Sequence, residues 1–125
     1  MPSVAIIGAS TNRKKYGNKA VRAYQQGGWT VYPINDRVAE VEGIQTFKSL
    51  SDVPGPINRI AMYVPPEVGI GLIDEIAAAK ADELFLNPGA ESEALVAGLE
   101  AQGVHPIQAC AVVNLGLRPE MFPDT

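Results

Sequence analysis

The stretch Ser3-Val4-Ala5-Ile6-Ile7-Gly8-Ala9-Ser10-Thr11-Asn12-Arg13-Lys14-Lys15-Tyr16-Gly17 decides the fold of this chain. Residues 3–8 form an apolar run that ends at Gly8, and a polar, cationic loop leads from there to a helix-compatible segment. A strand that is apolar on both faces belongs in the middle of a parallel sheet. The glycine permits a tight turn, and a helix start points free N–H groups toward an anion. The stretch therefore predicts a strand–loop–helix unit that binds phosphate groups.

The composition is that of one ordinary globular domain, which we expect to span residues 1–125. Apolar residues make up 46% of the chain and charged residues 19%, and the net charge of −4 argues against a broad basic surface for nucleic acid or anionic membrane. Cys110 is the single cysteine, so no internal disulfide is possible and a cytoplasmic location is expected. We also expect no signal peptide and no membrane span, because no apolar run approaches the roughly 20 residues that a span requires.

Apolar periodicity along the rest of the chain predicts an alternation of strands and helices. Strands are expected at 29–34, 58–64, 83–87 and 104–107, helices at 17–27, 65–77 and 91–102, and a helical turn at 49–53 within an otherwise irregular segment from 37 to 57. Such alternation implies a parallel sheet covered by helices on both faces, with ligands beyond the carboxyl ends of the strands. The loops to watch are therefore 8–17, 33–37, 63–67 and 87–90.

The first of these loops departs from the usual dinucleotide fingerprint. That fingerprint needs three glycines at G-x-G-x-x-G, whereas here Ser10 stands at the second position and no further glycine comes before Gly17. The residues Arg13-Lys14-Lys15 are basic in an otherwise acidic chain. They could form an ordinary solvated run, but their place directly after the turn favours an anion site. Asp36 ends the second strand, where it would either hold a ribose hydroxyl of NAD or serve as a polar turn residue.

The remaining reactive residue types give no catalytic or metal-binding pattern. His105, the only histidine, has no partner at ligand spacing, so we expect it to pack in its strand. Cys110 is expected to be a buried apolar thiol, with a reactive thiol near the ligand as the alternative. We find no paired carboxylates and no triad. Pro65 and Pro66 stand at a strand exit, where they would provide a rigid apolar wall and open the next helix.

An ordered set of segments resembles the small bacterial CoA-binding proteins, which are stand-alone relatives of the CoA-binding domain of the succinyl-CoA synthetase α subunit. The segments are Val4–Ser10, Val31–Asn35, Ser49-Leu50, Tyr63–Pro66 and Asn87–Ala90. The resemblance covers nearly the whole chain. Together with the alternation, it predicts an α/β, Rossmann-like three-layer fold with a five-stranded, mainly parallel sheet.

The resemblance also implies a ligand and the residues that hold it. In the synthetase-like domain the loop after the first strand holds the CoA phosphates, the residue closing the second strand contacts CoA, and the fourth-strand exit flanks the adenine or the pantetheine arm. The expected cofactor-binding residues are thus Gly8, Ser10, Thr11, Asn12, Arg13, Lys14, Gly17, Asn35, Tyr63, Val64 and Pro65. At the position of Asn35 the synthetase has a lysine. The synthetase's phosphohistidine belongs to a second domain, so the resemblance implies binding of CoA or acyl-CoA without ligase chemistry.

Two alternatives stay open on the sequence alone. The fold and Asp36 are compatible with an NAD(P)-binding oxidoreductase or a redox-regulatory subunit, although the glycine pattern is incomplete. The chain could instead act through its surface as a partner subunit or homodimer. An apolar patch in the tail would then mark the contact, formed by Leu115, Leu117, Met121 and Phe122.

Overall fold

A five-stranded parallel sheet forms the centre of the computed structural model, which describes residues 2–125. Its order is β2-β1-β5-β6-β7, and every neighbouring pair is parallel. The strands are β1 (Ser3–Ile7), β2 (Thr30–Ile34), β5 (Arg59–Met62), β6 (Glu83–Leu86) and β7 (Ile107–Gln108). The predicted α/β, Rossmann-like fold with a five-stranded sheet is confirmed.

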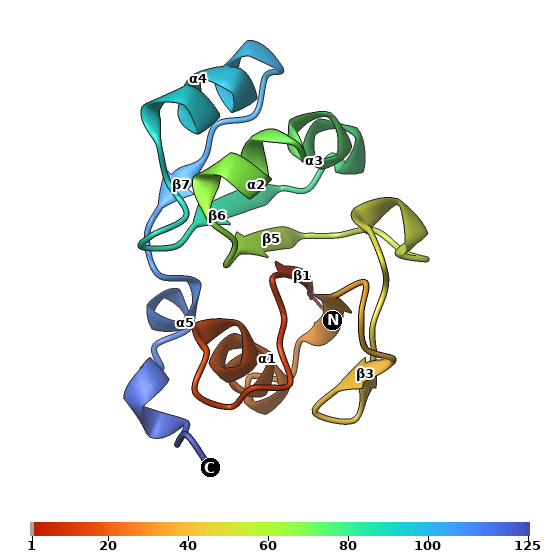
Figure 1. The fold of residues 1–125 in the computed structure, drawn as a ribbon, viewed down its shortest axis with the longest axis vertical. Coiled ribbons are helices and arrows are strands. Elements are labelled where there is room, and N and C mark those ends of the chain that lie inside the picture. The colour runs from red at the N-terminus through yellow and green to blue at the C-terminus, as the bar shows by residue number, and fades with distance from the viewer. Residues whose placement is uncertain (1) are drawn as a thin grey trace.

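Helices cover both faces of this sheet (Figure 1). One face carries α1 (Tyr16–Gln26) and α5 (Ala111–Asn114), and the other carries α2 (Pro66–Ile70), α3 (Ile73–Ala79) and α4 (Glu93–Ala101). Two short 3-10 turns, η1 (Leu50–Asp52) and η2 (Pro119–Met121), complete the helical elements. The result is the three-layer arrangement that the alternation predicted.

The strand β1 is central because both of its faces are apolar. Val4 and Ile6 pack into the core under α1, whereas Ala5 and Ile7 pack into the core on the opposite face. All five residues of β1 are buried. A period of two along a strand sends successive side chains to opposite faces, so a continuous apolar run supplies both cores.

The strand order places a ligand site at one point on the sheet. The chain leaves β1 for β2 on one side, then returns past β1 to β5 on the other. In open α/β sheets, ligands bind outside the carboxyl ends of the strands where the order reverses in this way. That point lies between β1 and β5.

The expected single helix over 65–77 is wrong, since the structure contains two helices there. Gly71 caps the end of α2, and Leu72 caps the start of α3. Gly71 weakens helix continuity because glycine has more backbone freedom to lose than other residues. The other predicted long elements begin and end within two residues of the observed bounds, except for the last strand.

The last strand is shorter than expected, and His105 does not pack. Only Ile107–Gln108 pair with β6, because Pro106 has no N–H for the ladder. The His105 side chain is 80% exposed and lies 3.9 Å from a carboxylate oxygen of Glu100. The prediction of a packing histidine is therefore wrong.

The irregular segment after β2 contains a small hairpin that periodicity did not predict. Its strands are β3 (Glu40–Val41) and β4 (Ile44–Gln45). Glu42 and Gly43 form the turn, both with positive φ (50° and 79°), which is the geometry of a two-residue hairpin turn. Directly after it, Phe47 pairs with Ile34 at the edge of β2.

The predicted tail patch does not exist as a patch. Phe122 is buried, and Leu115 and Leu117 pack against the core beside α1, which leaves Met121 alone exposed. Among residues 2–125, no helix has the length and apolar character that crossing a membrane requires.

Candidate functional site

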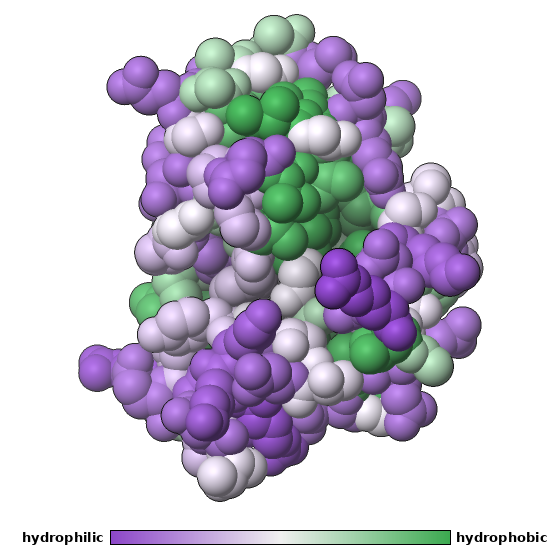
Figure 2. All heavy atoms as spheres, in the orientation of Figure 1, coloured by the Kyte–Doolittle hydropathy of each residue, from purple (hydrophilic) through white to green (hydrophobic). Residues whose placement is uncertain are grey.

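A large cavity opens at the carboxyl ends of the strands, where the strand order reverses. Its volume is about 990 Å³, and residues from all four predicted ligand loops line it. In Figure 2, apolar side chains gather over α2 and α3, while strongly hydrophilic ones lie near the segment that follows β2. The cavity thus has a polar end and an apolar end.

The turn at Gly8 brings the first strand directly against the cavity. Gly8 has φ +91°, and a Cβ there would lie 2.9 Å from the carbonyl oxygen of Tyr63. At Gly17, a Cβ would lie 2.1 Å from the carbonyl oxygen of Gly8. Both positions therefore require glycine, one for its backbone conformation and both for close approach. The start of α1 is held tightly against the end of β1.

Side-chain amides fix the loop between Gly8 and α1. The Asn35 amide donates to the Ala9 carbonyl at 2.8 Å, and the Asn18 amide donates to the Ser10 carbonyl at 2.9 Å. The Ser10 hydroxyl accepts from the N–H of Asn12 at 3.0 Å. These hydrogen bonds tie the loop to the end of β2 and to α1.

The start of α1 provides N–H groups for an anion. Within residues 2–125, the N–H groups of Tyr16 and Gly17 donate to no protein acceptor. Lys15, the residue at the helix N-cap position, lines the same part of the cavity. Free N–H groups, the positive end of the helix dipole and an ammonium group together favour a phosphate.

The structure separates the predicted loop residues into two groups. Gly8, Ser10 and Gly17 line the cavity, as do the residues predicted at the other strand exits, Asn35, Tyr63, Val64 and Pro65. The middle of the loop, residues 11–14, does not line it. The two ends of the loop therefore line the cavity, and its middle does not.

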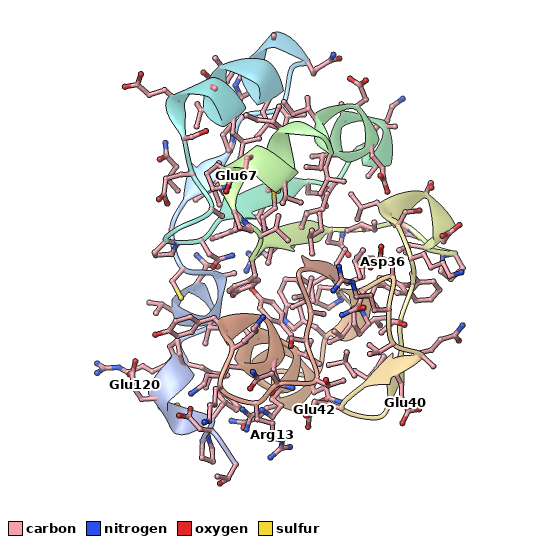
Figure 3. All side chains as sticks on the ribbon, in the orientation of Figure 1. Arg13, Asp36, Glu40, Glu42, Glu67 and Glu120 are labelled. Carbon is pink, nitrogen blue, oxygen red and sulfur yellow. The ribbon has the colours of Figure 1, made fainter. Side chains whose placement is uncertain are left out.

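Arg13 faces a carboxylate instead of the cavity. Its guanidinium donates to both Glu42 carboxylate oxygens, at 2.5 and 3.1 Å, and to the Thr125 carbonyl at 3.0 Å. The hydrogen bonds from Arg13 and then Asn18 lower the pKa of Glu42 from 4.5 to about 2. Figure 3 shows Arg13 and Glu42 together, apart from Asp36. The pair ties the loop to the hairpin.

Three cations line the cavity: Lys15, Arg37 and Lys48. The sequence placed Lys15 in the basic run that favours an anion site, but none of the three was among the expected cofactor-binding residues. Lys48 follows Phe47, whose N–H donates to the Pro33 carbonyl at 2.9 Å and so brings this segment alongside β2. No local sequence signal predicts that Lys48 lies at the cavity, because it is brought there by a contact between residues that are far apart in the sequence.

Two polar side chains, Asn87 and Tyr63, line the cavity at the exits of β6 and β5, and among residues 2–125 only the first has a hydrogen-bond partner. The buried Asn87 donates to the Met62 carbonyl at 2.8 Å and accepts from the Ala111 N–H at 2.8 Å. The Tyr63 hydroxyl is buried without a hydrogen-bond partner, and burial raises the pKa of Tyr63. Cys110 is half-buried on this wall, so the expectation of a fully buried thiol is wrong.

The lining changes in character along the cavity, from charged to apolar. No group of three or more His, Cys, Asp and Glu side chains able to hold a metal occurs in the part of the chain that the structure describes. The cations and the start of α1 lie toward β2 and β1, and most of the apolar side chains come from the exit of β5, from α2 and the start of α3, and from α5. A molecule with phosphates at one end and a less polar arm at the other fits this order.

Comparisons with known proteins agree with this geometry. A family model described as CoA binding domain matches residues 2–116. The chain is 40% identical over 65 residues to the acetate–CoA ligase [ADP-forming] II subunit alpha of Pyrococcus furiosus, a match that covers 50% of this chain and 14% of that subunit. The match therefore spans about one seventh of that relative's length.

Two solved structures have the same fold. A conserved hypothetical protein from Pyrococcus furiosus has 32% sequence identity and a TM-score of 0.81, with 91% of this chain and 99% of that chain covered. A dinucleotide-forming acetyl-coenzyme A synthetase of Ca. Korarchaeum cryptofilum, in complex with phosphate and ADP, has 26% identity and a TM-score of 0.74, covering 86% of this chain and 25% of that one. Because the family model spans nearly all of it, this chain belongs to the CoA binding domain family.

Proposed function

We propose that this chain binds coenzyme A in the cavity at the carboxyl edge of the sheet. One observation carries the proposal: a single cavity joins the cationic segment after β2, the open start of α1 and an apolar end. Coenzyme A has the same order of parts, namely a phosphorylated adenosine, a diphosphate and a pantetheine arm. Family membership supports the same ligand.

In this proposal the diphosphate lies at the start of α1. The N–H groups of Tyr16 and Gly17 and the Lys15 ammonium would meet it, while Gly8 and Ser10 shape the turn beside it. In this proposal, these N–H groups and the Lys15 ammonium take the phosphate-binding role that the sequence assigned to the cations in the middle of the loop. Contacts of CoA with Thr11, Asn12, Arg13 and Lys14 stay predictions.

The two ends of the ligand would reach the neighbouring strand exits. Asn35, Arg37 and Lys48 lie at the β2 end, where two cations suit the phosphorylated adenosine. The pantetheine arm would cross the exit of β5, along Tyr63, Val64 and Pro65. Proline offers no N–H there, so this wall accepts a largely apolar chain.

Calorimetry with CoA and with NAD tests the proposal. We expect heat of binding with CoA and weaker or no binding with NAD. Lys15→Gln and Lys48→Gln should each weaken CoA binding by about two- to tenfold, with less effect at high salt. Lys80→Gln, which removes a charge outside the cavity, should leave the affinity unchanged. Folded protein that gives no heat with millimolar CoA, or that binds NAD more tightly, would overturn the proposal.

A further inference from the structure

We propose that the apolar end of the cavity, between α2 and α5, holds the acyl chain of a CoA thioester, and that this chain is uncharged and longer than acetyl. The inference rests on the proposed function, since the CoA part of the same ligand fixes where the acyl group lies. It goes further by naming the class of acyl group.

Two valines, on helices that cover opposite faces of the sheet, line the cavity. Val68 on α2 is 49% exposed and Val113 on α5 is 56% exposed, and both line the cavity. Leu72 and Ala90 also line the cavity. A single exposed valine is ordinary, but apolar side chains from two separate helices around one cavity provide surface that a ligand can bury.

The position along the ligand is that of the thioester. With phosphates at the start of α1, the pantetheine arm passes β5 and reaches β6, about 10 Å away at the usual strand spacing. The sulfur would then lie near Asn87–Ala90, and a group attached to it would extend between Val68 and Val113. Free CoA would leave this end of the cavity unfilled.

The placement of the charged groups and the pairing of Asn87 disfavour a charged acyl group at this end. Both functional atoms of the Asn87 amide are bonded to backbone, so they have little left to offer a ligand. The cations Lys15, Arg37 and Lys48 line the cavity from the start of α1, from the segment that follows β2 and from the segment beside β2. The carboxylate that follows α5, Glu120, also lines the cavity and would repel an acyl carboxylate. An alkyl chain fits these conditions better than a succinyl group.

Calorimetry on the full chain with CoA, acetyl-CoA, butyryl-CoA and succinyl-CoA tests the inference. Burying two methylenes at a partly open site should make butyryl-CoA bind about three- to tenfold more tightly than acetyl-CoA. Succinyl-CoA has the same number of acyl carbons as butyryl-CoA and should bind more weakly than it does. Butyryl-CoA and acetyl-CoA binding within twofold of each other, or succinyl-CoA binding as tightly as butyryl-CoA, would overturn the inference.

Matched variants identify the surface responsible. Val68→Ser and Val113→Ser should reduce the preference for butyryl-CoA over CoA, while Ile70→Ser should not. Ile70 lies on the same helix as Val68 and is 45% exposed, but it does not line the cavity. An undiminished preference in both valine variants would overturn the inference. A chain that binds none of these compounds would refute the proposed function itself, whereas CoA binding without an acyl preference refutes the inference alone.

Discussion

Glu42→Gln tests how the phosphate loop is held. Glu42 accepts from Arg13 and from the Asn18 amide, and its pKa is lowered from 4.5 to about 2. A shift of this size corresponds to about 3 kcal/mol of stability at neutral pH. Because the Arg13 side chain is 41% exposed, solvent screening should reduce the measured effect to about 1–2 kcal/mol.

The pH dependence of this effect follows from the direction of the shift. A carboxyl whose pKa is lower in the folded protein stabilises it above the pKa of the unfolded chain. That stability is lost as the pH falls through the folded-state pKa. The difference between Glu42→Gln and the parent chain should therefore be full at pH 7 and shrink between about pH 5 and pH 2.

Urea unfolding at pH 7, 4 and 2.5 measures this difference. Glu40→Gln is the matched control, because Glu40 is an exposed carboxylate in the same hairpin. We expect the control to change the free energy of unfolding by no more than about 0.5 kcal/mol at any of these values. The reasoning is refuted if Glu42→Gln is neutral at pH 7, or if its cost grows as the pH falls.

Three further predictions concern the walls of the cavity. Gly17→Ala should lower the free energy of unfolding by at least about 2 kcal/mol, because its Cβ would overlap the Gly8 carbonyl, whereas Gly71→Ala should be nearly neutral in the same urea experiment. Asn87→Ala should cost about 2–4 kcal/mol by leaving a carbonyl of β5 and an N–H of α5 unpaired, and a loss below 1 kcal/mol would contradict this. Desulfo-CoA should slow alkylation of Cys110 severalfold, as followed by mass spectrometry; an unchanged rate at saturating ligand would mean that the ligand leaves this wall uncovered.

Local signals explain which parts of the fold the sequence predicts well. The continuous apolar run of β1 and the glycine that ends it are adjacent in the chain, so both the central strand and the turn follow from residues 3–8. The split between α2 and α3 was visible only as Gly71, a residue that a helix also tolerates. Apolar spacing continues through that break and so conceals it.

Contacts between distant residues explain what the sequence does not predict at the site. Arg13 pairs with Glu42, 29 positions away, so a cation expected at the phosphates is directed to a hairpin. Lys48 reaches the cavity because Phe47 pairs with Ile34. Neither of these contacts can be predicted from the spacing of apolar residues. The strand ends can be predicted in that way, and the loops at all four of them line the cavity.

The hydrogen bonds that fix the Ala9 and Ser10 carbonyls also bear on the kinetics of capture. Since protein groups already bond this backbone, we expect that little of the binding free energy is spent on arranging it. Recognition here should resemble docking on a rigid surface, with association rates of about 10⁵–10⁷ per molar per second and no slow closing step. Differences in affinity among related ligands would then arise mainly from differences in their dissociation rates.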